Sequence, residues 1–161
     1  MTRILANILT RGLVLGLVLG ALASPARADK KLYDRLGGVG PISVVVDEFI
    51  NRLVADDLLN KNPAIKEARD RVPAPYLKFH VTALICQVSG GPCKYTGRDM
   101  KSSHAKLNIT EAEWDEMAKV FKEVLDKFKV PEKEQKELFT AVGATKKDIV
   151  AGAAKAPPAK K

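Results

Sequence analysis

Apolar residues between positions 41 and 143 recur mostly at spacings of three and four, the period of a helix with one buried face. Pro41 can open a helix with apolar positions at Val45, Val46, Phe49, Ile50, Leu53 and Val54. Thr110 and Glu113 form a capping box before another stripe of Trp114, Met117, Ala118, Phe121, Leu125 and Phe128. Pro131 starts a helix that buries Leu138, Phe139 and Val142 and ends near Gly143. Strand signals are weak, so the pattern predicts an all-α domain.

Residues 76–88 have a different pattern, because they are apolar nearly all round the helix that they predict. Such a helix is either contacted on several sides or lines a cavity. Its apolar or weakly polar positions are Tyr76, Leu77, Phe79, His80, Val81, Ala83, Leu84, Ile85 and Val88, and the sequence Gly90-Gly91-Pro92 ends it. Residues 60–75 contain three prolines and scattered charges, which predicts a connecting segment with at most a short helical turn.

Residues 1–28 have the layout of a secretory signal. Arg3 and Arg11 precede an apolar run over residues 12–23, which is too short and glycine-rich for a membrane span. Ala26 and Ala28 supply the small residues that a signal peptidase needs. We therefore predict cleavage before Asp29, a periplasmic or secreted protein, and no stable membrane insertion of the mature chain; the alternative is an uncleaved anchor.

The rest of the chain divides into one domain over residues 29–150 and a tail. Residues 151–161 read AGAAKAPPAKK, a composition that cannot bury a core, so we predict a disordered tail. Cleavage removes three arginines and no acidic residue, so the formal charge falls from +8 to +5. The basic residues are interleaved with acidic ones, as on a solvated surface, and we expect no nucleic-acid partner.

Cys86 and Cys93 are the two cysteines of the chain, separated by a turn that contains the Gly90-Gly91 pair. In an oxidising compartment they can form a disulfide, provided that the helix carrying Cys86 ends at the two glycines. Closing so short a loop contributes about 2–3 kcal/mol to stability. The sequence leaves this disulfide and a pair of free thiols as alternatives.

The chain contains two histidines, and both lie among apolar or small residues. His80 is inside the apolar helix, and His104 lies in the sequence MKSSHAKL of residues 100–107. A neutral imidazole can bind iron or zinc, and two histidines on separate segments can hold one metal from opposite sides. Zinc is disfavoured, because it usually requires three or four closely spaced ligands. From the residues alone, each histidine is either a metal ligand or a core side chain with satisfied hydrogen bonds.

Several motifs in order along the chain resemble those of group 1 truncated haemoglobins. They are Leu32-Tyr33-Asp34-Arg35-Leu36-Gly37-Gly38, Val46-Asp47-Glu48-Phe49 with Ala55-Asp56-Asp57, and Gly90-Gly91-Pro92 followed by Tyr95-Thr96-Gly97-Arg98-Asp99-Met100, His104, Leu107, Ile109 and Thr110. The resemblance covers Lys31 to about Val150. It implies a truncated two-over-two helical globin sandwich around haem b (iron protoporphyrin IX).

The resemblance also implies the roles of individual residues. His104 corresponds to the proximal iron ligand, with apolar walls from Met100, Leu107, Ile109, Trp114 and Met117. A gapless alignment backwards from Gly90 places His80 where some family members carry a histidine that binds iron from the distal side. The alternative is that His80 turns to the pocket rim and hydrogen-bonds a haem propionate or solvent. The remaining distal lining consists of Phe49, Ile50, Leu77 and Val81.

The distal side departs from the family pattern. Ile50 stands where the family usually has tyrosine, and Leu77 and Val81 stand where it often has glutamine or another polar residue. Such a pocket stabilises bound dioxygen weakly, because each neutral hydrogen bond contributes about 0.5–1.5 kcal/mol. His80 is the remaining donor, unless Tyr76 enters the pocket instead. The usual phenylalanine pair after the second helix is also missing, and the connection over residues 60–75 is longer than usual.

These observations favour a haem protein that reversibly binds dioxygen or another diatomic gas. The alternatives are a periplasmic electron-transfer protein with two histidine ligands and a redox partner, an enzyme of the nitric oxide dioxygenase or peroxidase kind, and a helical interaction domain without haem. The apolar distal set makes the enzymatic alternative weaker than reversible binding.

Overall fold

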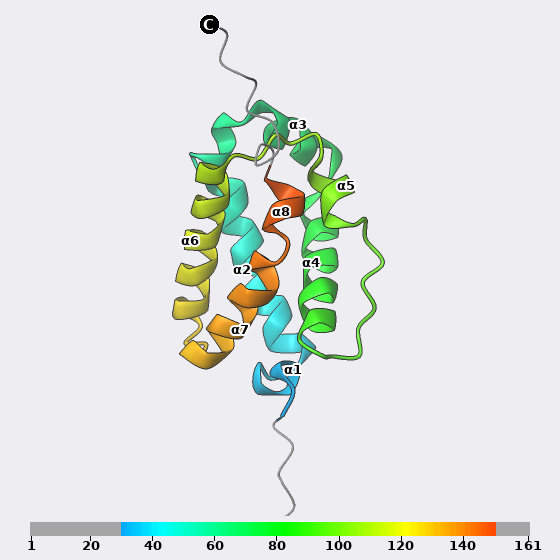
Figure 1. The fold of residues 1–161 in the computed structure, drawn as a ribbon, viewed down its shortest axis with the longest axis vertical. Coiled ribbons are helices and arrows are strands. Elements are labelled where there is room, and N and C mark those ends of the chain that lie inside the picture. The colour runs from blue at the N-terminus through cyan, green and yellow to red at the C-terminus, as the bar shows by residue number, and fades with distance from the viewer. Residues whose placement is uncertain (1–29, 151–161) are drawn as a thin grey trace, which may run out of the picture.

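The computed structural model describes residues 30–150, and every regular element in that range is a helix (Figure 1). The predicted all-α class is therefore confirmed. The elements are α1 (Leu32–Arg35), α2 (Val39–Ala55), the 3-10 turn η1 (Leu59–Lys61), α3 (Pro63–Arg71), α4 (Ala74–Val88), α5 (Met100–His104), α6 (Glu111–Lys127), α7 (Glu132–Gly143) and α8 (Lys146–Ile149). The predicted signal peptide (1–28) and the predicted tail (151–161) lie outside the described residues. Within 30–150, no helix combines the length and the hydropathy that crossing a membrane requires.

Helix α2 is the centre of the fold, because it packs against α4 on one side and α6 on the other (Figure 1). Its buried stripe consists of Ile42, Val46 and Ile50, each at most 4% exposed. Val81 and Ile85 from α4 pack onto this stripe. A second cluster joins α6 to α7 through Phe121, Leu125 and Leu138. The two clusters share α2, so the core extends continuously from α4 to α7.

The sequence placed the ends of α2 less well than its centre. The helix begins at Val39 rather than at Pro41, because Gly38 is the N-cap with a φ of +85°, a conformation that favours glycine. Val54 was predicted on the buried face but is 39% exposed. Ile42, Val46, Ile50 and Val54 follow one another at spacings of four residues, whereas one helical turn takes 3.6. Each step of four therefore rotates the side chain by about 40° around the helix axis, and Val54 lies beyond the edge of the core.

The connecting segment is more helical than predicted. The expectation of at most a short turn between residues 60 and 75 is wrong, because α3 runs from Pro63 to Arg71. The Asn62 side chain caps this helix by accepting hydrogen bonds from the backbone N–H groups of Ala64 (2.9 Å) and Ile65 (3.3 Å). Pro63 occupies the first turn of α3, where a missing N–H costs nothing.

The capping box at the start of α6 forms as predicted. The Thr110 hydroxyl accepts from the Glu113 N–H at 3.2 Å, and the Glu113 carboxylate accepts from the Thr110 N–H at 2.7 Å. Burial of Glu113 raises the pKa of its carboxyl, but the hydrogen bonds from Thr110 and Asn62 together outweigh that effect and the net pKa is lowered. Glu113 therefore stays ionised while it is only 8% exposed.

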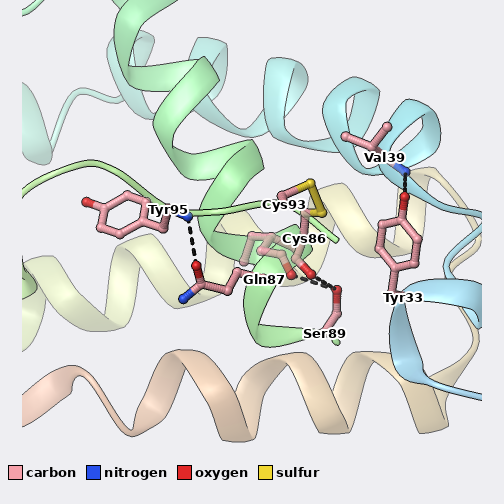
Figure 2. Close-up of a disulfide and its surroundings, with 8 residues drawn as sticks. Tyr33, Val39, Cys86, Gln87, Ser89, Cys93 and Tyr95 are labelled. Atoms are coloured by element: carbon pink, nitrogen blue, oxygen red, sulfur yellow. Dashed lines mark hydrogen bonds between the residues drawn. A yellow bond between two sulfur atoms is a disulfide. The ribbon is translucent and has the colours of Figure 1, made fainter. Parts of the chain in front are cut away.

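Cys86 and Cys93 form a disulfide, with their Cα atoms 5.7 Å apart (Figure 2). Of the two alternatives that the sequence left open, a disulfide or a pair of free thiols, the structure contains the disulfide. The bond joins the end of α4 to the loop that leads to α5. A Cβ on Gly91 would lie 2.4 Å from the Tyr33 ring and 2.7 Å from the Cys86 sulfur, so the turn closes only with glycine at that position.

We expect Cys93→Ser to destabilise the haem-free protein by about 2–3 kcal/mol, since the open chain gains the entropy that the cross-link removes from the unfolded state. Equilibrium unfolding in urea measures this loss. Dithiothreitol provides the control, because it should bring the midpoint of the wild type close to that of the variant and leave the variant unchanged. Equal midpoints for wild type and variant without reductant would contradict the stabilising role.

Candidate functional site

His104 ends the short helix α5, whose start is fixed by Asp99. The Asp99 carboxylate accepts from the Ser102 N–H at 2.8 Å and from the Ser102 hydroxyl at 2.6 Å. These hydrogen bonds lower the pKa of Asp99, so the cap is ionised at neutral pH. Helix α5 has five residues and is too short to be stable by itself, so this cap and its contacts with α8 hold it in place (Figure 1).

The imidazole of His104 is held in one tautomer. Its Nδ1 lies 2.8 Å from the carbonyl oxygen of Met100. A carbonyl only accepts, so Nδ1 carries the proton and donates, which leaves the lone pair on Nε2. Burial lowers the pKa of His104, partly offset by the bond to Met100, and the ring is neutral at neutral pH. A neutral imidazole with a free Nε2 and a donating Nδ1 is the form that binds a metal ion.

His80 lies within α4 and is surrounded by aromatic rings. Its ring centroid is 4.2 Å from that of Tyr76, 5.2 Å from that of Phe79 and 5.9 Å from that of Tyr95. Its Nδ1 is buried and has no hydrogen-bond partner among residues 30–150. A buried polar atom without a protein partner is costly, and an ordered water or a bound group can satisfy it.

The predicted distal residues come together in part. Phe49, Ile50 and Val81 belong to one cluster between α2 and α4, in which Ile50 is 2% exposed. Leu77 stands outside this cluster and is 37% exposed. Helix α4 is not covered all round by protein, since Tyr76 and Phe79 are also exposed. Protein covers α4 on the side of α2 and on the side of Tyr95, and leaves the side of Tyr76 and Phe79 exposed.

The predicted proximal residues lie before and after His104 in the sequence, between positions 100 and 117, and all of them are partly or fully buried. Ile109 and Trp114 are buried, and Met100, Leu107 and Met117 are half-buried. Asn62 donates from its Nδ2 to the Leu107 carbonyl at 2.9 Å. The residue that caps α3 therefore also fixes the chain just after His104, a contact that the sequence did not indicate.

An apolar hollow elsewhere in the fold is not the candidate site. It lies where α2, α6 and α7 meet and is lined by Leu36, Val45 and Phe121, among others. Neither histidine lines it. The donor chemistry of His104 and the unpartnered nitrogen of His80 therefore identify the site, rather than this hollow.

The family model described as bacterial-like globin matches residues 31–151. The group 1 truncated haemoglobin GlbN of Nostoc commune is 36% identical over 88 residues, which cover 55% of this chain and 70% of that protein. The GlbN of Mycolicibacterium paratuberculosis is 30% identical over 123 residues, which cover 76% of this chain and 86% of that protein. The predicted resemblance is therefore confirmed over nearly the whole described range.

Solved structures show the same fold. The truncated haemoglobin of Tetrahymena pyriformis in its Fe(III) form superposes with a TM-score of 0.67 and 20% identity, and the match covers 76% of this chain and all of that one. A 2/2 haemoglobin from Synechococcus with covalently attached haem superposes with a TM-score of 0.66 and 22% identity over the same shares. These matches confirm the two-over-two sandwich.

Truncated haemoglobins bind haem b, and the residues of this chain fit that group. The neutral, oriented imidazole of His104 provides an iron donor. Exposed apolar side chains at the start of α4, such as Leu77, are those that a flat apolar cofactor can cover. By sequence and by fold, the chain belongs to the bacterial-like globin family, as a group 1 truncated haemoglobin.

Proposed function

We propose that this protein holds haem b through Nε2 of His104 and binds dioxygen or another diatomic gas on the opposite side of the iron. The observation that carries the proposal is the hydrogen bond from His104 Nδ1 to the Met100 carbonyl. That bond and the burial of the ring leave Nε2 deprotonated and fixed in direction. Globins bind diatomic gases such as dioxygen, which supports the second half of the proposal.

When bound, haem supplies an iron with one position for a gas molecule, and the residues of this chain set the surroundings of that position. Phe49, Ile50 and Val81 present apolar surface, and none of their side chains can donate a hydrogen bond. Such surroundings favour a ligand of low polarity over one that needs stabilisation of negative charge. For the same reason we do not favour nitric oxide dioxygenation or peroxidase chemistry.

Electron transfer is a second candidate function, supported by His80. Its ring is confined by the side chains of Tyr76, Phe79 and Tyr95. An imidazole held in this way would supply a second nitrogen donor to a bound haem. A redox partner would then exchange electrons with the protein, and a gas ligand would have to displace His80.

We also propose, from residues 1–28, that the protein is exported to the periplasm or secreted. The proposal is independent of the haem site and rests on the basic start, the short apolar run and the Ala26-x-Ala28 sequence. Expression of the full chain in a Gram-negative host should give mature protein in the periplasmic fraction with Asp29 as its first residue. N-terminal sequencing and intact mass check this, and a variant with Arg for Ala28 is the matched control that should remain uncleaved. Full-length protein in the membrane fraction would instead indicate an anchor.

Replacement of His104 tests the proximal ligand. We expect His104→Gly to weaken haem binding more than about 100-fold, because loss of a residue that merely supports a metal ligand already costs about 10- to 100-fold. Added imidazole should restore the haem complex of this variant, since it can occupy the vacated space and donate to iron. Haem titration followed by the Soret band measures both effects. The proposal fails if His104→Gly binds haem as tightly as the wild type without imidazole.

Replacement of His80 separates the two candidate functions. If His80 binds the iron, the ferric wild type is low-spin without added ligand and His80→Ala is high-spin. CO should then bind the ferrous variant about tenfold faster or more, since the open state of the wild type is the minor one, populated at about 0.1–10%. Lys78→Ala is the matched control, because Lys78 lies on the same helix but pairs with Asp47 at the surface (2.6 Å). A high-spin ferric wild type would exclude electron transfer through two histidine ligands and would retain gas binding as the proposed function.

A further inference from the structure

Tyr95 is anchored at both ends in the segment between α4 and α5. Its backbone N–H donates to Oε1 of Gln87 at 2.7 Å, which attaches it to the end of α4 (Figure 2). Its hydroxyl donates to the carbonyl oxygen of Arg98 at 2.6 Å. In Figure 2 the ring extends away from the disulfide. The position of this side chain is therefore set by contacts on both sides.

The loop is shaped around the Tyr95 side chain. A Cβ on Gly97 would lie 2.4 Å from the Tyr95 hydroxyl oxygen, so any other residue there would displace the hydroxyl. Tyr95 is half-buried, and burial raises the pKa of its phenol. The hydroxyl is therefore protonated at neutral pH and remains a donor to Arg98.

The Tyr95 ring meets His80 edge to face. The two ring centroids are 5.9 Å apart and the ring planes make an angle of 84°. The other two aromatic neighbours, Tyr76 and Phe79, belong to the same helix as His80 and are 56% and 64% exposed. Of the three rings, Tyr95 is thus the one that restrains His80 from a different part of the chain.

The same side chain reaches the segment that carries His104. The acceptor of its hydroxyl, Arg98, directly precedes Asp99, which caps α5. Tyr95 therefore contacts His80 through its ring and the start of α5 through its hydroxyl. The extended segment between α4 and α5 runs back along α4 to make this possible (Figure 1).

We propose that Tyr95 is a positioning residue, whose ring holds the His80 imidazole at the distal side of the haem site while its hydroxyl fixes the ring to the backbone that leads into α5. This inference rests on the proposed function, because His80 must face a bound haem. An edge-to-face aromatic contact changes an equilibrium by about 2- to 12-fold. Loss of the ring should therefore release His80 from the distal side to that extent.

A double-mutant cycle between Tyr95 and His80 tests this proposal. The full chain is reconstituted with haem as wild type, Tyr95→Leu, His80→Ala and the double variant, and CO association with the ferrous protein is measured by flash photolysis. We expect Tyr95→Leu to speed CO binding about 2- to 12-fold and to lower the low-spin fraction of the ferric spectrum. The same substitution should leave the CO rate unchanged when His80 is already alanine, since the residue through which it acts is gone.

Two further variants separate positioning from general loss of structure. Tyr95→Phe keeps the ring but loses its bond to the Arg98 carbonyl, and its CO rate should lie between those of the wild type and Tyr95→Leu. Tyr33→Phe, which loses a hydroxyl that accepts from Val39 at 3.2 Å, should leave the CO rate unchanged. Tyr95→Met, which fills space without a ring, replaces Tyr95→Leu if that variant does not fold.

Each outcome of the cycle decides for or against Tyr95. Equal effects of Tyr95→Leu in both backgrounds, or no effect in either, would overturn the proposal while haem binding by His104 stands. A wild type that shows no Soret band after reconstitution would overturn this proposal and the proposed function together.

Discussion

The packing of α2 between α4 and α6 is the constraint on which the rest of the molecule depends. Its stripe of Ile42, Val46 and Ile50 buries against α4, while Val45 and Phe49 pack against the cluster that α6 forms with α7, so α2 fixes the distance and direction of α4. Helix α4 in turn carries His80 and, at its end, Cys86. Burying three such side chains contributes about 1.5–3 kcal/mol each. Disruption of this stripe would move α4, and with it the proposed distal side of the haem site, as a unit.

The proximal side is held differently, by polar contacts rather than by a large core. The five-residue α5 depends on its Asp99 cap, on the Asn62 bond to Leu107 and on α8. Few apolar side chains of α5 are buried. A segment fixed mainly by directional hydrogen bonds keeps one orientation of His104 without burying much surface, which leaves room for a large flat cofactor.

The sequence predicted the parts of the fold that are encoded locally. The periodicity of α2, α6 and α7 and the capping box at Thr110 each depend on neighbours within one or two turns. It missed α3, because that helix has no buried residue and gains its start from the Asn62 cap instead of an apolar stripe. It also left the disulfide open, since the approach of Cys93 to Cys86 depends on how tightly the turn at Gly91 folds.

For the site, the residues alone left His104 as either ligand or core, and the family resemblance favoured the ligand. The tautomer that supports this role follows from the Met100 carbonyl, an i−4 contact visible only once α5 is in place. The contact of Tyr95 with His80 joins residues 15 positions apart through a returning loop, and no spacing rule indicates it. The sequence thus identified individual candidate site residues, whereas the contacts between those residues could be seen only in the folded structure.

The burial of Cys86 has a consequence for the lifetime of the cross-link. Cys86 is 0% exposed and Cys93 is half-buried, so Cys93 is the more accessible of the two residues to an incoming thiolate. The sulfur expelled would then be that of Cys86, and an apolar setting disfavours the thiolate that has to leave. Mild reductants should therefore reduce the disulfide slowly. The bond then acts as a structural disulfide of the folded protein and not as a reversible redox switch.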